Sequence, residues 1–259
     1  MDLQLAGKRV FVSGSTQGIG YAIAAAFASE AAEVVLNGRS DVDTAVERLR
    51  AAHPTASVSG IAADFADPRA VHGLIDRLGH VDVVVNNVGV FDLADITELP
   101  DSEWTRSFEI NVMSGVRLSR ALLPGMLEAG WGRIVFIGTE SAVDVPGDMI
   151  HYGATKAAAL ALSNGLAKLT KGTGVTVNTV LGGPTYSDGV ARTVEAIASR
   201  QGVAPDVLRA ALVRTSSLVQ RFIEPEEISA FVAFLASPRA SATNGAALRV
   251  DGGVLPTTL

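Results

Sequence analysis

The sequence predicts an α/β fold, in which one doubly wound domain holds a mostly parallel sheet of seven strands with helices on both faces. Short segments that are apolar at every position alternate with helical patterns of about 10–15 residues. Strands that are apolar throughout are buried on both faces, as in parallel sheets. With 48% hydrophobic and 19% charged residues, the chain can fill a large core. Since no linker, repeat or low-complexity segment interrupts residues 1–259, we expect a single domain.

The first half of the chain shows the most regular alternation. The expected strands span residues 9–14, 33–38, 57–64 and the start of 81–89, and the expected helices residues 20–32, 41–52 and 68–79. Asp41 stands where a side chain could cap the second of these helices. Each strand–helix–strand unit needs a right-handed crossover, and successive crossovers build a doubly wound sheet.

The second half continues the pattern with longer helices. Glu103 to Glu128 is one long helix or two, with a kink at Pro124. Further strands are expected at 132–139, 174–184 and 246–253, and a helix that carries Tyr152 lies between the first two. Residues 188–222 predict one or two extra helices. The last helix starts near Pro225, and its first turn is acidic, as the helix dipole favours.

Composition and charge exclude several classes of function. The net charge of -6 and the pI of about 5.2 give no electrostatic footprint for nucleic acid, and no run of Lys or Arg suggests a membrane surface. The chain has no cysteine, and its four histidines show no ligand spacing, so we expect no metal site. The first residues do not resemble a signal peptide, and no apolar run approaches the roughly 20 residues of a membrane helix. We therefore expect a cytoplasmic protein.

The stretch SGSTQGIG, residues 13–20, joins the first expected strand to the first helix. In this G-x-x-x-G-x-G pattern, Gly14 permits a tight turn, Gly18 lets the backbone approach a phosphate, and Gly20 lets helix and strand pack closely. The helix N-terminus adds N–H groups and partial positive charge for a pyrophosphate. We therefore expect a dinucleotide site here, formed by Gly14, Ser15, Gln17, Gly18, Ile19 and Gly20.

Other motifs follow in order: NNVG at 86–89, Asn111 within EINVMSG, YGATK at 152–156, GGPTYS at 182–187 and VDGG at 250–253. Together with the glycine-rich turn, they resemble the short-chain dehydrogenase/reductase family, in particular its 3-oxoacyl-carrier-protein reductases. The resemblance covers essentially the whole chain, and it implies a Rossmann-type fold and an NAD(P)-dependent enzyme. It also implies that Asp64 lies near the adenine and that Asn86 and Gly89 lie along the adenosine side.

The end of the second expected strand indicates which nicotinamide cofactor binds. NAD enzymes of this fold usually place Asp or Glu there, to bind the adenosine ribose hydroxyls. Here Gly38 takes that position and Arg39 follows. Without the carboxylate a 2′-phosphate is not repelled, and a guanidinium can pair with it bidentately, which favours NADP(H). Gln17 stands where many NADP-dependent relatives carry a second basic residue, so NAD(H) stays open.

Tyr152 and Lys156 stand four residues apart, on the same face of the expected helix. Carbonyl reduction needs a hydride from the cofactor and a proton on the oxygen, and a tyrosine can supply that proton. A free tyrosine has a pKa of about 10. A lysine ammonium group one turn away and an oxidised nicotinamide both favour the phenolate, so we expect a lowered pKa for Tyr152. Lys156 can also hold the nicotinamide ribose, and the resemblance implies that Asn111 holds a water that links Lys156 to solvent.

The resemblance also implies which hydroxyl holds the substrate oxygen. Where the family has Ser, thirteen positions before the tyrosine, this chain has Thr139, which we assign first; Ser141 is the alternative. In the loop that meets the nicotinamide, Gly182 replaces the usual proline ahead of Gly183. Gly183 and Thr185 remain expected contacts of the cofactor there.

Substrate choice falls to the loop after the fifth strand and to the helices of residues 185–222. Their candidate residues are Glu140, Asp144, Val145, Met149, His151, Tyr186 and Val190. This mixture suggests a neutral or polar small carbonyl compound, and leaves a sugar, a cyclic ketone, a steroid or an acyl-carrier ketone open.

The sequence therefore predicts an NADP(H)-dependent oxidoreductase that interconverts a carbonyl and a secondary alcohol, acting as a reductase. An NAD(H)-dependent alcohol dehydrogenase and a non-catalytic dinucleotide sensor or scaffold are the alternatives. The resemblance implies a homotetramer or a dimer as the assembly.

Overall fold

In the computed structural model, residues 1–258 are described, and they form one sheet of seven parallel strands in the order β3-β2-β1-β4-β5-β6-β7. The strands are β1 (Arg9–Val12), β2 (Glu33–Gly38), β3 (Ser57–Ala62), β4 (Val83–Asn86), β5 (Trp131–Thr139), β6 (Gly174–Gly182) and β7 (Ala247–Val250). The predicted fold class is therefore confirmed. Strand ends differ by a few residues from the prediction; β3, for example, ends at Ala62 and not at Asp64.

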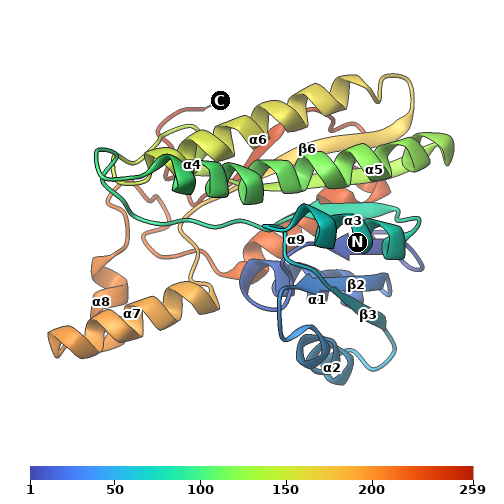
Figure 1. The fold of residues 1–259 in the computed structure, drawn as a ribbon. Helices are drawn as coiled ribbons and strands as arrows, with labels where there is room; N and C mark the ends of the chain where they lie inside the picture. Colours follow the sequence, from blue (N-terminus) through green and yellow to red (C-terminus); the bar gives the residue numbers. More distant parts are fainter. Residues whose placement is uncertain (259) are drawn as a thin grey trace.

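Helices cover both faces of the sheet (Figure 1). They are α1 (Gly18–Ser29), α2 (Val42–Ala52), α3 (Pro68–Leu78), α4 (Asp101–Phe108), α5 (Ser114–Glu128), α6 (Ile150–Lys168), α7 (Asp188–Gln201), α8 (Pro205–Ala211) and α9 (Pro225–Ala236). One face packs against α1, α2 and α9, and the other against α3, α5 and α6. None of the helices in residues 1–258 combines the length and the apolar character that crossing a membrane requires.

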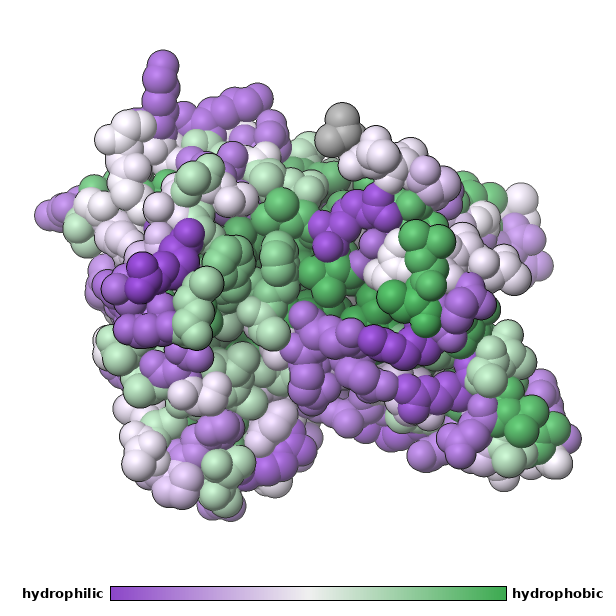
Figure 2. Space-filling model, turned by 180° about the vertical axis from the view of Figure 1, so that it is seen from behind, coloured by the Kyte–Doolittle hydropathy of each residue, from purple (hydrophilic) through white to green (hydrophobic). Residues whose placement is uncertain are grey.

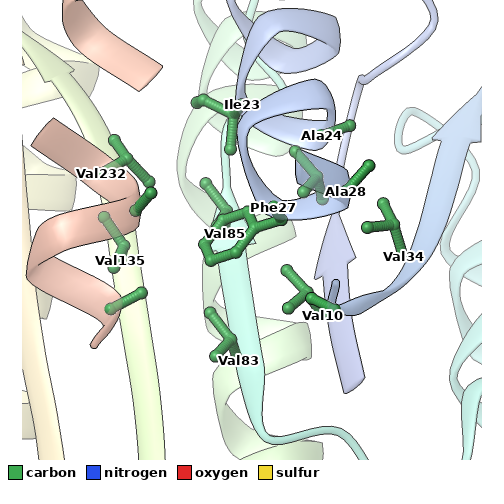
Figure 3. Close-up of a cluster of buried hydrophobic side chains, with 14 of the residues drawn as sticks. Val10, Ile23, Ala24, Phe27, Ala28, Val34, Val83, Val85, Val135 and Val232 are labelled. Carbon is green, nitrogen blue, oxygen red and sulfur yellow. The ribbon is translucent and has the colours of Figure 1, made fainter. Parts of the chain in front are cut away.

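The central strand β4 shows why uniformly apolar segments become buried strands. Successive side chains of a strand point to opposite faces. Val83 and Val85 accordingly enter the core layer with Phe27 of α1 and Val232 of α9, whereas Val84 enters the opposite layer (Figure 3). Since burial of each such side chain contributes about 1.5–3 kcal/mol, a strand between two helix layers favours apolar residues at every position.

One expectation about helix geometry is wrong. Asp41 stands at the N-cap of α2, but it has a left-handed backbone (φ 60°) and its side chain caps no N–H group; it accepts a hydrogen bond from Ser40 instead. A second expectation concerned Pro124: α5 continues through this residue, with Leu123 and Met126 held in the core, and the kink expected there stays a prediction. The irregular stretch lies earlier, in a π-helical turn, η1 (Glu109–Met113).

The order of strands reverses direction between β1 and β4, and open α/β sheets bind their ligands outside the carboxyl ends of the strands at such a point. The glycine-rich turn, Asn86 and Thr139 follow or end β1, β4 and β5 at this edge. Helices α7 and α8 extend from the body of the molecule beyond it (Figure 1). From behind, hydrophobic patches interrupted by hydrophilic residues lie where these helices meet the body (Figure 2).

Candidate active site

The glycine-rich turn has the backbone that its sequence predicts. Gly14 and Gly18 have positive φ angles of 62° and 58°, which side chains rarely adopt. A Cβ on Gly20 would lie 2.3 Å from the carbonyl oxygen of Gly14, so only glycine lets α1 start this close to β1. The side chain of Asn87, which the sequence analysis did not single out, braces the turn by donating to the carbonyl oxygens of Ser13 (3.0 Å) and Gly14 (2.9 Å).

The predicted residues of the turn have different surroundings. Ser15 is fully buried, and its hydroxyl donates to the carbonyl oxygen of Val12 at 2.7 Å, so this side chain does not face a ligand. Ile19 lines the cavity described below. The backbone N–H of Gly18 donates to the carboxylate of Asp188 at 2.8 Å, and Gln17 accepts a hydrogen bond from Arg192 at 3.0 Å. The start of α7 therefore lies directly over the turn.

At the end of β2, Gly38 makes room for the turn. A Cβ there would lie 2.5 Å from Cγ2 of Thr16. Arg39 is exposed beside it. A second cation lies close to the turn: Arg48 donates to the carbonyl oxygen of Thr16 at 3.0 Å, and its guanidinium stacks over Tyr21. Since Arg48 reaches this position through the packing of α2, no local motif indicated it.

The predicted adenosine side holds one buried amide group without a partner. Asn86 is 8% exposed, and neither polar atom of its side chain has a hydrogen-bond partner within the described residues. Asp64, partly buried, accepts a hydrogen bond from the backbone N–H of Ala66. A buried amide group without partners favours a polar ligand. Together with the glycine-rich turn, it fits a dinucleotide at this edge of the sheet.

Tyr152, Lys156 and Thr139 are brought together by α6 and the end of β5, and all three line one cavity. The ammonium group of Lys156 lies 5.8 Å from the centre of the Tyr152 ring and donates to the carbonyl oxygen of Ile137 at 3.0 Å. The ring of Phe91 packs edge-on against Tyr152. Burial lowers the pKa of Lys156 to about 8.

The expected lowering of the Tyr152 pKa is wrong for the protein without cofactor. Burial of the ring raises the pKa, and the nearby carboxylate of Glu140 raises it further, whereas a hydrogen bond with Thr139 lowers it. Lys156 turns its ammonium group toward Ile137, so it does not offset the burial. Tyr152 therefore holds its proton at neutral pH.

Of the two candidate hydroxyls, Thr139 is the one next to the tyrosine. Its Oγ1 donates to Oε2 of Glu140 and lies close enough to Tyr152 to lower the pKa of that phenol. The hydroxyl of Ser141 donates to Oε1 of Glu140 at 3.3 Å. Both hydroxyls therefore depend on one carboxylate, but the position expected from the strand register is the one in contact with Tyr152.

Asn111 lies in the π-helical turn η1, a type of bulge that often occurs at functional sites. Its amide nitrogen donates to Val90 O (2.9 Å) and to Thr155 Oγ1 (2.9 Å), and its oxygen accepts from Val90 N (2.8 Å). Gly89 lies beside both this oxygen and the ammonium group of Lys156. The side chain can therefore accept one more hydrogen bond but can donate none.

The loop after β6 passes close to the C-terminal segment. A Cβ on Gly183 would lie 2.6 Å from the carbonyl oxygen of Asp251, so this position requires glycine. Thr185 is buried, and its hydroxyl donates to Gly183 O at 2.8 Å. Gly182 and Gly183 both line the cavity.

The cavity has a volume of about 350 Å³. Among the predicted substrate residues, Glu140, Met149 and Val190 line it. Asp144, Val145, His151 and Tyr186 are not among its lining residues, and His151 instead packs against Trp104. Four further lining residues come from distant loops and belong to no motif of the sequence: Phe91, Leu212, Arg214 and Phe222. Residues 1–258 contain no group of three or more His, Asp or Glu side chains that could hold a metal ion.

Comparison with known proteins shows the family. Residues 14–255 match a family model described as Enoyl-(Acyl carrier protein) reductase. The chain is 43% identical over 260 residues to the uncharacterized oxidoreductase YvaG of Bacillus subtilis, covering 98% of each chain. It is 31% identical over 253 residues to the D-beta-hydroxybutyrate dehydrogenase of Cupriavidus necator, covering 96% of this chain and 98% of that one.

A solved structure agrees closely with the fold. It is the crystal structure of L-sorbose reductase from Gluconobacter frateurii complexed with NADPH and L-sorbose. The TM-score is 0.95 at 32% identity, and the match covers 99% of this chain and 100% of the other. The two relatives with named substrates therefore act on chemically different compounds, a ketose and a hydroxy acid.

Proposed function

Because the chain belongs to the short-chain dehydrogenase/reductase family of oxidoreductases, we propose that it is an NADP(H)-dependent reductase that converts a carbonyl into a secondary alcohol. One observation carries the proposal: Thr139, Tyr152 and Lys156 meet in a single cavity at the carboxyl edge of the sheet. The glycine-rich turn lies at the same edge, and one of its residues, Ile19, lines the same cavity.

The residues have complementary tasks in this reaction. When bound, the dinucleotide supplies the hydride. Tyr152 donates its phenolic proton to the carbonyl oxygen, and its raised pKa keeps it in the protonated form that reduction requires. Thr139 positions that oxygen by a hydrogen bond when its single O–H turns from Glu140 to the substrate. Lys156, largely charged at neutral pH, binds the ribose hydroxyls, and Asn111 has one acceptor position left for a water beside Lys156.

The preference for NADP(H) rests on charge at the end of β2. Gly38 offers no carboxylate, and Arg39 and Arg48 place two guanidinium groups on the elements that flank the glycine-rich turn. Guanidinium groups pair well with phosphate. The structurally similar L-sorbose reductase was crystallised with NADPH, which supports NADP(H) as the cofactor here. NAD(H) is the alternative.

A fluorescence titration of NADPH and NADH tests the cofactor assignment with wild type, Arg39→Ala and the control Arg77→Ala, an arginine in the last turn of α3. We expect wild type to prefer NADPH, Arg39→Ala to lose about tenfold in NADPH affinity, as for one charge-assisted contact, and Arg77→Ala to match wild type. Preference for NADH in wild type would instead support NAD-linked alcohol oxidation.

Turnover of a carbonyl panel by wild type and Tyr152→Phe tests the catalytic assignment. We expect the variant to bind NADPH normally and to lose about 10²–10⁴-fold in turnover. A wild type that binds NADPH but reduces nothing would support the non-catalytic sensor or scaffold. We also propose that the protein assembles as a homotetramer or a dimer, and light scattering measures this. The cytoplasmic location and the single domain over residues 1–259 stay predictions.

A further inference from the structure

Glu140 is a buried carboxylate inside the cavity, next in sequence to Thr139. Its side chain is 4% exposed, and it is the one acidic residue among the described residues that line the cavity. Removing a carboxylate from water costs several kcal/mol unless it is paired and hydrogen-bonded. Its position near the reacting groups therefore needs an explanation.

Arg214 supplies the pairing charge from a distant part of the chain. Its Nη2 lies 3.1 Å from Oε1 of Glu140. Arg214 follows α8, so the ion pair links the end of β5 to the segment that we expect to bind the substrate. The Arg214 side chain is 33% exposed and also lines the cavity.

The hydrogen bonds around this pair leave both donors and acceptors for a ligand. A carboxylate has about four acceptor positions, and Glu140 uses two of them in hydrogen bonds from Thr139 and Ser141, besides its ion pair with Arg214. A guanidinium group has five N–H donors, and the contact with Glu140 accounts for one of them. A hydroxyl group, which both donates and accepts, complements one free acceptor beside free donors.

Other ligand groups fit this position less well. A substrate carboxylate would bring a second negative charge next to Glu140, whose charge Arg214 already balances. An alkyl group would cover the pair without replacing the hydrogen bonds that the pair makes to water, which is costly. Because Glu140 is the direct neighbour of Thr139, the recognised group lies on a carbon close to the carbonyl.

The size of the cavity limits the rest of the substrate. Its volume of about 350 Å³ is near the lower end of the range typical for small-molecule sites. The nicotinamide has to occupy part of the same space. We propose, on the basis of the proposed function, that Glu140 and Arg214 recognise a hydroxyl group next to the carbonyl, so that the substrate is a small hydroxyketone.

The test compares matched ketones with NADPH: erythrulose, 2-butanone, which has the same carbon chain without hydroxyls, and acetoacetate, which carries a carboxylate. We expect kcat/KM for erythrulose to exceed that for 2-butanone at least about tenfold, as one hydrogen bond to a charged group provides. Glu140→Gln keeps the shape of the side chain and removes its charge. Both Glu140→Gln and Arg214→Gln are expected to reduce the ratio of the two kcat/KM values about tenfold or more.

Arg209→Gln is the matched control. Arg209 lies on α8, pairs with Glu224 at 2.6 Å and is not among the residues that line the cavity. The control is expected to keep the wild-type ratio, and thermal unfolding checks that each variant folds. Because Arg214 is partly exposed on a loop, its variant tests the proposal even if Glu140→Gln does not fold.

The outcomes separate the two proposals. Equal use of erythrulose and 2-butanone, a preference for acetoacetate, or a preference that survives both substitutions overturns the hydroxyl site and leaves the reductase proposal standing. Reduction of none of the ketones by a protein that binds NADPH overturns the reductase proposal, and the hydroxyl site falls with it.

Discussion

Lys156 illustrates that a site residue can oppose the stability of the fold. It is 8% exposed, its ammonium group donates to the carbonyl oxygen of Ile137, and burial lowers its pKa from 10.5 to about 8. One pKa unit corresponds to about 1.4 kcal/mol, so keeping this charge inside the fold costs about 3 kcal/mol at neutral pH. Replacing it by methionine removes that cost and loses one hydrogen bond. We expect Lys156→Met to raise the free energy of unfolding by about 1–2 kcal/mol.

The effect has a defined dependence on pH. The pKa of Lys156 in the folded protein lies below its value in the unfolded chain, so between about pH 8 and 10.5 the unfolded chain binds more protons than the folded protein. Stability of the wild type therefore rises with pH across that window, and the full cost is present only below it. Since the variant lacks the group, its advantage over wild type should shrink by about half or more from about pH 7 to about pH 9.5.

Urea denaturation at the two pH values measures this difference, with Lys171→Met as the control. Lys171 is exposed just after α6, so its substitution should change stability by less than about 0.5 kcal/mol, equally at both pH values. Lys156→Met should also lose most of its NADPH affinity, as expected where activity and stability conflict. A variant less stable than wild type by more than about 1 kcal/mol at neutral pH, or an advantage that does not change with pH, would refute the reasoning.

Three further predictions concern the other parts of the site. Thr139→Ala should lower kcat about 100-fold and Ser141→Ala less than about tenfold, measured under saturating NADPH; the reverse order would transfer the oxygen-holding role to Ser141. Gly20→Ala should abolish NADPH binding and lower the Tm, because its Cβ would lie 2.3 Å from a backbone oxygen, whereas Gly73→Ala, with no atom within 4 Å of its Cβ, should stabilise helix α3 by up to about 1 kcal/mol. Asp188→Asn should tighten NADPH binding several-fold in a titration, since a carboxylate on an N–H group of the glycine-rich turn repels phosphate; unchanged affinity would contradict this role for Asp188.

The features that the sequence predicted well depend on contacts within short segments. The buried strands are recognisable in the sequence because both of their faces are buried, so every position is apolar, as in residues Val83–Val85 of β4. The glycine-rich turn depends on the close approach of Gly20 to Gly14, six residues apart, which any Cβ on Gly20 would prevent, so the spacing of the glycines alone carries the information. Tyr152 and Lys156 share a helix face for the same reason. Physical interactions of this range leave a readable pattern in a sequence.

The features that the sequence did not predict depend on contacts between distant segments. Asp188 meets Gly18 across 170 positions, and Arg48 reaches the glycine-rich turn through the packing of α2. The sequence predicts a lowered pKa for Tyr152 from two positive charges, Lys156 and an oxidised nicotinamide. In the protein without cofactor, burial and the carboxylate of Glu140, just after β5, raise this pKa instead, and neither has a local signature.

The pair of Glu140 and Arg214 lies between these two cases. The position of Glu140 directly after the fifth strand is enough to predict an acid in the site. Its partner Arg214 lies 74 residues later in a segment without a motif, so the sequence does not predict that the charge of Glu140 is balanced. Without Arg214, a buried acid beside Tyr152 suggests only that anionic substrates are excluded. With Arg214, the same carboxylate becomes half of a neutral donor–acceptor pair, which is the basis of the proposed hydroxyl site. Under these proposals, the reaction is encoded locally in α6 and the glycine-rich turn, whereas substrate choice depends on how the segment after α8 folds back over the end of β5.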